Sequence, residues 1–172
     1  MKFVNYLIIA TTLAFCTPAL MAQTQKTENP NPYQLMGGPG IVTSVSATPQ
    51  QLPKAAQEFL QTYYSRVMVG PINHNVVKDM YNVELGNGVN VTFTADGKVD
   101  DIQSPGTEPL YSPAVKAVLP AKAYKHLEDA GLLEEVTGIK NAVGKGLRVQ
   151  LLNAMPPEML FDVNGLFIIV DD

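Results

Sequence analysis

Two kinds of hydrophobic spacing alternate along this chain, and together they predict its elements. After Pro53, apolar residues recur three or four positions apart, as on one face of a helix: Ala56, Phe59, Leu60, Tyr63 and Tyr64. Further on they occupy every second position, as in strands with one buried face: Tyr81, Val83 and Leu85, then Val89, Val91 and Phe93. The pattern predicts a helix followed by antiparallel strands.

The second half of the chain repeats this order. Residues 52–60 and 81–87 match residues 119–127 and 147–153, and residues 93–97 match 161–165, at offsets of 66 to 68 residues. The second helix is expected to begin at Pro120, and its apolar face is Ala123, Tyr124, Leu127 and Ala130. The inward strand positions are Leu147, Val149 and Leu151, then Met159, Phe161 and Val163. We therefore predict an α+β fold of two tandem repeats within one globular unit. Each repeat is a helix packed on a three- to four-stranded antiparallel meander sheet, at residues 45–108 and 109–172.

Glycine and proline mark the expected boundaries. Gly70 and Pro71 are expected to end the first helix, and Gly131 the second. Asp96-Gly97 and Asn164-Gly165 are expected to be hairpin turns. Short strands are predicted at residues 41–45, 98–102 and 166–170, with fourth strands around residues 72–73 or 139–140 and an extra helical turn at residues 112–118.

The first 22 residues are typical of a signal peptide. Lys2 is followed by an apolar run at residues 7–15, and Ala22 is the predicted cleavage site. The run is too short for a membrane-spanning helix, which needs roughly 20 residues. Residues 23–44, rich in Gln, Thr, Asn, Pro and Gly, are expected to be a flexible leader. The protein is therefore predicted to be exported, as a periplasmic or secreted protein that does not span the membrane. A lipoprotein acylated at Cys16 is the alternative.

The charge of the mature chain argues against one class of partner. Of the 12 basic residues, 11 remain once Lys2 is removed, against 16 acidic residues, so the net charge is −5. The sequence has no basic stripe, and nucleic acid is therefore not an expected partner.

Few residues suggest metal chemistry. His74 and His126 do not form a pair at helical spacing, and cleavage after Ala22 removes the only cysteine. Residues 162–165 resemble part of a calcium loop, but Leu160 would occupy its first ligand position. A hairpin turn accounts for the same residues, so no metal and no cofactor are predicted.

Catalytic groups are not evident either. Asp100 and Asp101 are adjacent on a predicted strand, so we expect their carboxylates to point to opposite faces. The sequence also has no Gly-x-Ser-x-Gly motif. We predict that the protein is not an enzyme and has no catalytic residues.

Taken together, these motifs resemble those of the PepSY-like family of exported bacterial proteins. The resemblance covers residues 45–172. It rests on two helices opened by Leu-Pro, the Tyr-x-Val-x-Leu-x-Asn-Gly hairpin at residues 81–88, the Phe-x-x-Asp/Asn-Gly turns and the closing Asp-Asp pair. That family is also described as resembling the beta-lactamase inhibitor protein. The resemblance implies two α/β repeats whose sheets join or adjoin, without assigned catalytic residues. Inhibition is an analogy at the level of the fold.

The remaining candidates are surfaces. The outward sheet face of the second repeat is more apolar than that of the first, and six residues are its candidate binding residues: Arg148, Gln150, Leu152, Leu160, Phe167 and Ile169. We predict an exported, non-enzymatic binding module that holds a protein or peptide of the cell envelope, with an inhibitor as one form. The alternative is a small-ligand or envelope sensor with an apolar molecule between the repeats. For the apolar last strand, the alternatives are a central place in the sheet or a weak homodimer contact.

Overall fold

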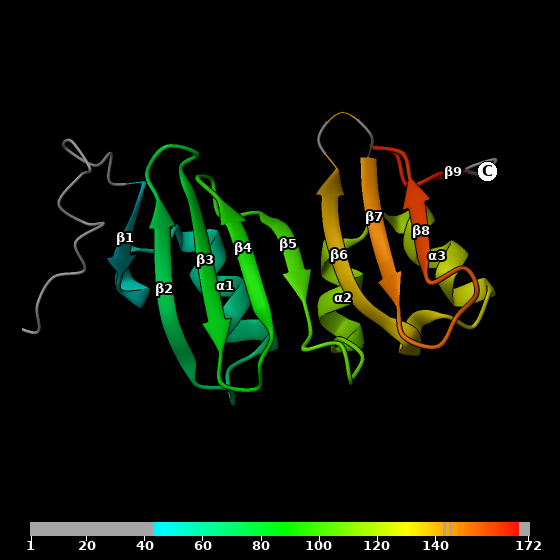
Figure 1. Ribbon diagram of the computed structural model, residues 1–172, viewed down its shortest axis with the longest axis horizontal. Coiled ribbons are helices and arrows are strands. Elements are labelled where there is room, and N and C mark those ends of the chain that lie inside the picture. Colours follow the sequence, from blue (N-terminus) through cyan, green and yellow to red (C-terminus); the bar gives the residue numbers. More distant parts are fainter. Residues whose placement is uncertain (1–42, 143, 145, 169–172) are drawn as a thin grey trace, which may run out of the picture. The chain divides into compact units, whose positions relative to one another are not determined.

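The computed structural model describes residues 43–142, 144 and 146–168. The predicted signal peptide and nearly all of the leader lie outside this range. The described part is α+β: one antiparallel sheet of nine strands, with three α-helices (Figure 1). Each strand pairs with the next one along the chain, in the order β1 to β9.

The first half of the sheet carries one helix. Its elements are β1 (Ser44–Ala47), the 3-10 turn η2 (Pro49–Gln51), α1 (Lys54–Tyr63), β2 (Val69–Asn75), β3 (Met80–Leu85), β4 (Asn90–Thr94) and β5 (Val99–Gln103). The second half carries two. Its elements are α2 (Ser112–Val118), α3 (Ala121–Asp129), the 3-10 turn η3 (Leu133–Glu135), β6 (Val136–Ala142), β7 (Gly146–Leu151), β8 (Glu158–Phe161) and β9 (Phe167–Ile168).

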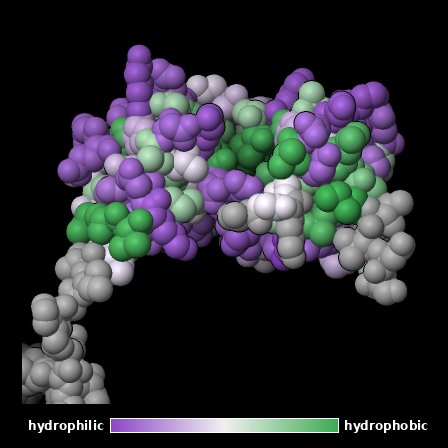
Figure 2. All heavy atoms as spheres, turned by 90° about the horizontal axis from the view of Figure 1, so that it is seen from above, coloured by the Kyte–Doolittle hydropathy of each residue, from purple (hydrophilic) through white to green (hydrophobic). Residues whose placement is uncertain are grey.

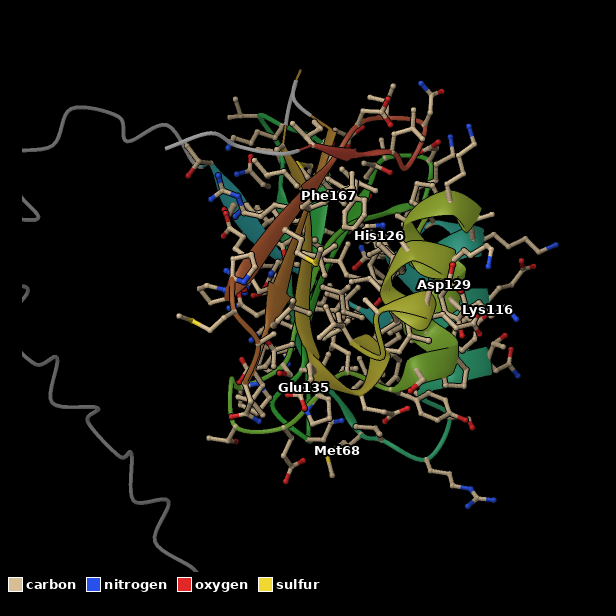
Figure 3. The ribbon with its side chains drawn as sticks, turned by 90° about the vertical axis from the view of Figure 1, so that its right-hand side faces the viewer. Met68, Lys116, His126, Asp129, Glu135 and Phe167 are labelled. Atoms are coloured by element: carbon tan, nitrogen blue, oxygen red, sulfur yellow. The ribbon has the colours of Figure 1, made fainter. Side chains whose placement is uncertain are left out.

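The helices lie on one side of the sheet and bury its apolar face (Figure 3). The predicted inward positions Val83, Val91, Phe93, Val149 and Phe161 are fully buried. Opposite them, Ala56 and Leu60 of α1 and Ala123 and Leu127 of α3 are buried too. The alternation of apolar residues therefore identifies most of the core correctly.

Two predicted core positions are wrong. Val163 is 77% exposed because β8 ends at Phe161, so the alternation stops there and Val163 lies in the following turn. Ala130 is exposed because α3 ends at Asp129, one residue before it.

The expected end of the first helix is also wrong. The helix already ends at Tyr63, and Gly70 and Pro71 lie within β2. Proline lacks an N–H for the sheet ladder, but the β2–β3 register is irregular between Val69 and Ile72, where Pro71 lies. A strand therefore accommodates a proline that the sequence suggests as a helix terminator.

The two predicted turns contact the helix starts closely. Gly97 has φ +81°, and a Cβ placed there would lie 2.8 Å from the backbone nitrogen of Ala56. Gly165 has φ +80°, and its Cβ would lie 2.8 Å from the Cβ of Pro120 and 2.9 Å from the nitrogen of Ala123. Each turn thus requires glycine for its backbone conformation and for its packing.

Three residue pairs join the two halves into one sheet: Asp101 with Lys140, Ile102 with Ile139, and Gln103 with Gly138. At the other end of the sheet, β9 pairs with β8 and is the last strand. The interpretation that the apolar last strand is central is therefore wrong.

Candidate functional site

The sheet side opposite the helices, called the open face here, presents mainly polar side chains. They alternate with the buried residues of the same strands, as Asn82 does with Val83 and Thr92 does with Val91. Since the helices pack on the other side, no helix of the described chain covers this face (Figure 3).

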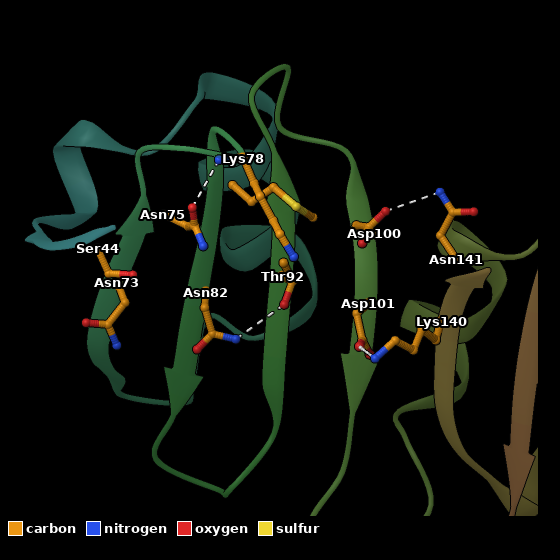
Figure 4. Close-up of a pocket in the computed structure, with 11 residues that line it drawn as sticks. Ser44, Asn73, Asn75, Lys78, Asn82, Thr92, Asp100, Asp101, Lys140 and Asn141 are labelled. Atoms are coloured by element: carbon orange, nitrogen blue, oxygen red, sulfur yellow. Dashed lines mark hydrogen bonds and ion pairs between the residues drawn. The ribbon is translucent and has the colours of Figure 1, made fainter. Parts of the chain in front are cut away.

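A hollow of about 690 Å³ lies on the open face and extends from β1 to β6. We call it the polar hollow. Its lining from the first half includes Ser44, Asn73, Asn75, Lys78, Asn82 and Thr92, with Met80 as an apolar exception (Figure 4). Asn82 Nδ2 donates a hydrogen bond of 3.2 Å to Thr92 Oγ1. Amides and hydroxyls both donate and accept hydrogen bonds, so the hollow suits a polar ligand or polypeptide.

Both carboxylates of the acidic pair line this hollow, so the expectation that they point to opposite faces is wrong. The cause is an irregularity in the β4–β5 ladder. Thr92 pairs with Asp101 and Phe93 pairs with Val99, which leaves Asp100 as an extra residue. Such a bulge interrupts the strict alternation of side chains.

Each carboxylate of the pair already has a partner on β6. Asn141 Nδ2 donates to Asp100 Oδ1 at 3.2 Å, and Lys140 Nζ lies 3.2 Å from Asp101 Oδ2 (Figure 4). Together with Lys78, the hollow has two formal positive and two formal negative charges. Its formal charges therefore cancel.

Four of the predicted binding residues lie together beside the polar hollow, at β7 and β8. Arg148 is exposed, and its Nε lies 3.0 Å from Glu158 Oε1. Gln150 Oε1 accepts a hydrogen bond of 3.4 Å from Gln103. The half-buried Leu160 pairs with Arg148 across the ladder, and the half-buried Leu152 follows the end of β7. We call Arg148, Gln150, Leu152 and Leu160 the β7–β8 patch.

Phe167 does not belong to this patch, and its predicted place on the open face is wrong. Its ring stacks on His126 of α3, with the centroids 4.9 Å apart and the planes inclined by 17° (Figure 3). The β8–β9 register pairs Phe167 with the buried Phe161, whereas Ile168 pairs with Leu160. Ile168 is therefore the β9 residue that neighbours the β7–β8 patch, through its pairing with Leu160. Ile169 lies outside the described residues.

The histidines have structural contacts. His74 Nε2 lies 2.8 Å from Asp79 Oδ1, and the His74 ring stacks on Tyr81 with centroids 4.2 Å apart. His126 packs against Phe161 and Phe167. In residues 43–142, 144 and 146–168, no group of three or more His, Cys, Asp or Glu side chains is arranged to hold a metal ion.

The segment that resembles a calcium loop forms a turn. Asp162 Oδ1 accepts hydrogen bonds from the backbone N–H groups of Leu166, at 2.7 Å, and Asn164, at 2.9 Å. The bond from Leu166 is the main reason that the pKa of Asp162 is lower than usual. The carboxylate thus holds the hairpin.

A second recess lies on the helix side, where the two halves meet. One hollow of about 300 Å³ is lined by Ala55, Phe59, Gly97, Lys98, Val99, Ala117 and Val118. A hollow of about 190 Å³ shares Val99 and Val118 with it, and also touches Asp100, Asn141, Gly146, Leu147 and Val163. We call the two together the helix-side cleft. Figure 2 shows hydrophobic side chains gathered in a recess between the halves.

Comparison with known proteins identifies the fold. Three crystal structures of Bacteroides proteins match most of the chain. One, from Bacteroides thetaiotaomicron, is described as a candidate calcium-regulated periplasmic protein. It is 23% identical, covers 77% of this chain and all of its own, and has a TM-score of 0.61. The other two come from Bacteroides vulgatus, and each is described as a candidate periplasmic protein.

Of these two, one is of unknown function and is 23% identical over 75% of this chain and 99% of its own, with a TM-score of 0.60. The other, of the DUF2874 family, is 22% identical over 77% of this chain and all of its own, with a TM-score of 0.61. No protein-family model and no curated protein matches the chain. These likenesses show the α+β fold. The periplasmic descriptions agree with the exported location predicted from the signal peptide.

Among the described helices, none is long and apolar enough to cross a membrane.

Apart from Asp100 and Asp101, the sequence does not single out the residues that form the polar hollow. Asn73 and Asn75 lie in β2, which is seven residues long where a very short strand is expected. Two polar residues spaced by two beside the apolar Ile72 are the signal that identifies this strand. The contribution of Lys140 and Asn141 depends on the pairing of β5 with β6, which has no local sequence signal.

Proposed function

We propose that the protein is a periplasmic, non-enzymatic binding module that holds a protein or peptide on the open face of its sheet. The observation that carries this proposal is a sheet face that no described helix covers, with the polar hollow and the β7–β8 patch side by side. Nine strands about 4.8 Å apart and about five residues long give a face of roughly 700 Å². That is close to the ~800 Å² that one partner buries in a stable complex.

The chemistry of the open face favours a partner without a strong net charge. The formal charges in the polar hollow cancel, so a highly charged surface would gain little net attraction there. The side chains of Asn73, Asn82 and Thr92 suit the N–H and C=O groups of a polypeptide, which need both donors and acceptors. Leu152 and Leu160 add apolar area at one end of the face.

The non-enzymatic part of the proposal is supported by the engagement of the acidic pair. Asp100 accepts a hydrogen bond from Asn141, and Asp101 forms an ion pair with Lys140, so both carboxylates already have partners within the protein. The proposal includes membership of the PepSY-like family, which the motifs of the sequence support. An inhibitory role rests on the analogy with the beta-lactamase inhibitor protein alone.

We also propose that the fold consists of two copies of one unit. The support is the equivalent contact in each half: Gly97 against Ala56 at the start of α1, and Gly165 against Ala123 at the start of α3. Both helices have a proline as N-cap, Pro53 in the first and Pro120 in the second. Two turns with nearly equal φ at equivalent positions are expected of a duplicated helix–meander unit.

The test is a cross-linking capture from envelope extract with the mature chain as bait. The exposed Asn73 is changed in an N73R variant, which fills the polar hollow, combined with L160Q in the β7–β8 patch. K122E, at an exposed position on α3, is the matched control on the helix side. We expect one partner that the wild type and K122E recover and the open-face variant loses. Recovery of no partner, or equal loss in K122E, would refute the proposal.

A second candidate function is the binding of a small apolar ligand between the halves. It is favoured by the helix-side cleft, where the half-buried apolar side chains of Phe59, Val99, Val118 and Leu147 line adjoining hollows. Concave sites lined by apolar side chains with a few polar groups are typical of small-molecule binding.

A further inference from the structure

A further hollow, of about 420 Å³, lies where α1 meets the η2 turn and the start of β2. We call it the α1 hollow. Its apolar lining consists of Pro49, Leu52, Leu60, Val67 and Val69. It shares no lining residue with the polar hollow or with the helix-side cleft. The α1 hollow is therefore a site separate from both.

The second half of the chain shows why this corner is open in the first half. The helix α2 and the turn η2 have the same place in the chain order, because each is followed by Leu-Pro and then by the long helix of its half. α2 has seven residues, contacts β6, and buries Ala114 and Val115. η2 has only three residues and buries none of them. The first half thus has no counterpart to the buried side of α2, and its corner is left as a hollow.

The α1 hollow differs from the other two sites in charge. None of the described residues that line it has a charged side chain, whereas the polar hollow and the helix-side cleft each include Lys and Asp. Its polar groups are the amides and hydroxyls of Gln57, Gln61, Ser65 and Tyr64. The amide nitrogen of Gln57 already donates to the Leu52 carbonyl at 2.8 Å. A charged ligand would lose hydration here without gaining an opposite charge, so the lining favours an uncharged one.

Tyr64 adds a specific polar requirement to this lining. It is only 5% exposed, and its hydroxyl has no hydrogen-bond partner among the residues that the structure describes. Most buried side-chain polar groups in native proteins do have a partner. Burial raises the pKa of Tyr64 to about 12, so the hydroxyl keeps its proton and can donate a hydrogen bond. Since Tyr64 lines the α1 hollow, a ligand bound there can supply the acceptor.

We propose that the α1 hollow binds an uncharged, mainly apolar small molecule whose carbonyl oxygen accepts a hydrogen bond from the Tyr64 hydroxyl. The apolar part of this ligand packs against Leu52, Leu60 and Val67. A volume of about 420 Å³ is within the range of small-molecule sites, which is about 300–1,000 Å³. This site goes beyond the proposed function, because it uses neither the open face nor the helix-side cleft.

The test is a titration of the mature chain with three ring compounds, followed by NMR of the backbone amides. Acetophenone carries a carbonyl group, α-methylstyrene has nearly the same shape with a methylene group in place of the oxygen, and benzoate is charged. Acetophenone should bind about fivefold more tightly than α-methylstyrene, which corresponds to one hydrogen bond between neutral groups. It should also bind at least about fivefold more tightly than benzoate. The largest shift changes are expected in residues 60–69.

Two tyrosine variants identify the hydrogen bond. Y64F removes the hydroxyl and keeps the ring, so it should weaken acetophenone about fivefold and leave α-methylstyrene unchanged. Y63F is the matched control, because Tyr63 is the neighbouring tyrosine and does not line the α1 hollow. Y63F should change the affinity for neither compound. Circular dichroism establishes that both variants are folded.

The outcomes separate this inference from the functions proposed above. Equal affinity of the wild type for acetophenone and α-methylstyrene would overturn it, and so would an equal loss in Y63F and Y64F. It is also wrong if no probe binds. Shift changes centred on Val99 and Val118 would overturn it as well, and would instead support the second candidate function. Binding of a protein partner on the open face is decided separately, by the N73R capture experiment.

Discussion

A single methyl group added at Gly97 tests the packing of the turn against the start of α1. In G97A, the new Cβ would lie 2.8 Å from the Ala56 nitrogen and 3.0 Å from the Cβ atoms of Ala55 and Pro53. A residue with a Cβ at this left-handed φ costs roughly 1–2 kcal/mol. The forced contacts with the helix add about 1–3 kcal/mol. Alanine also reduces the conformational freedom of the unfolded chain, which offsets about 0.4–1 kcal/mol of this cost. We expect G97A to lower the free energy of unfolding by about 1–4.6 kcal/mol.

G106A is the matched control. Gly106 has φ +85°, close to that of Gly97, but a Cβ there would meet no atom within 4 Å. Only the cost of the left-handed φ and the reduced freedom of the unfolded chain apply. G106A should therefore lower the free energy of unfolding by about 1 kcal/mol. Urea unfolding of both variants, followed by far-UV circular dichroism, measures the difference. An unchanged m-value identifies the loss as one of native stability.

The reasoning is refuted if the two variants lose the same stability, because the helix contact would then contribute nothing. G165A extends the test to the second half, where the added Cβ would lie 2.8 Å from that of Pro120. Its control is G131A, since Gly131 has φ +69° and open space around it. A neutral G165A would contradict the equivalence of the two turns.

Four other predictions concern single positions. The hydrogen bond from Lys98 lowers the pKa of Asp96 to about 2. The ionised Asp96 therefore stabilises the fold at a pH above its usual pKa, and this contribution is lost as the pH falls toward 2. D96N should be less stable than the wild type at pH 6, and the free energies of unfolding of the two proteins should converge near pH 2. Burial raises the pKa of Tyr64 to about 12, so stability should fall as the pH rises above 10, and Y64F should remove that fall in alkaline unfolding. F161A removes a fully buried ring and should cost about 3–5 kcal/mol in urea unfolding, whereas a loss below 1 kcal/mol would contradict the assigned core. Mass spectrometry of the exported protein should show Gln23 as its first residue, and an acylated product would contradict the predicted cleavage.

The regular elements could be predicted from the sequence because their signals are local. The alternation at Val83, Val91 and Phe93 gives both the strands and the buried face, and the spacing of Ala56 and Leu60 gives the inner face of α1. Such patterns depend on which side of an element faces the core. They are independent of which strands become neighbours.

What depends on neighbouring strands could not be predicted in this way. The side of the sheet on which Asp100 lies follows from the β4–β5 bulge, and the place of Phe167 follows from its register with Phe161. Pro71 lies in a strand because the ladder is irregular beside it. The polar hollow combines residues of β1 through β6 and therefore depends on pairings that no single segment encodes.

The consecutive order of the strands has a consequence for how this chain acquires its structure. Since every strand pairs with the next one in sequence, each new pairing needs only residues that have already emerged and a short stretch that follows. Contacts of low sequence separation form quickly, and chains fold from the N-terminus as they are released. The first half of the sheet can thus form before β6 arrives, and the β5 edge is then available to pair with β6.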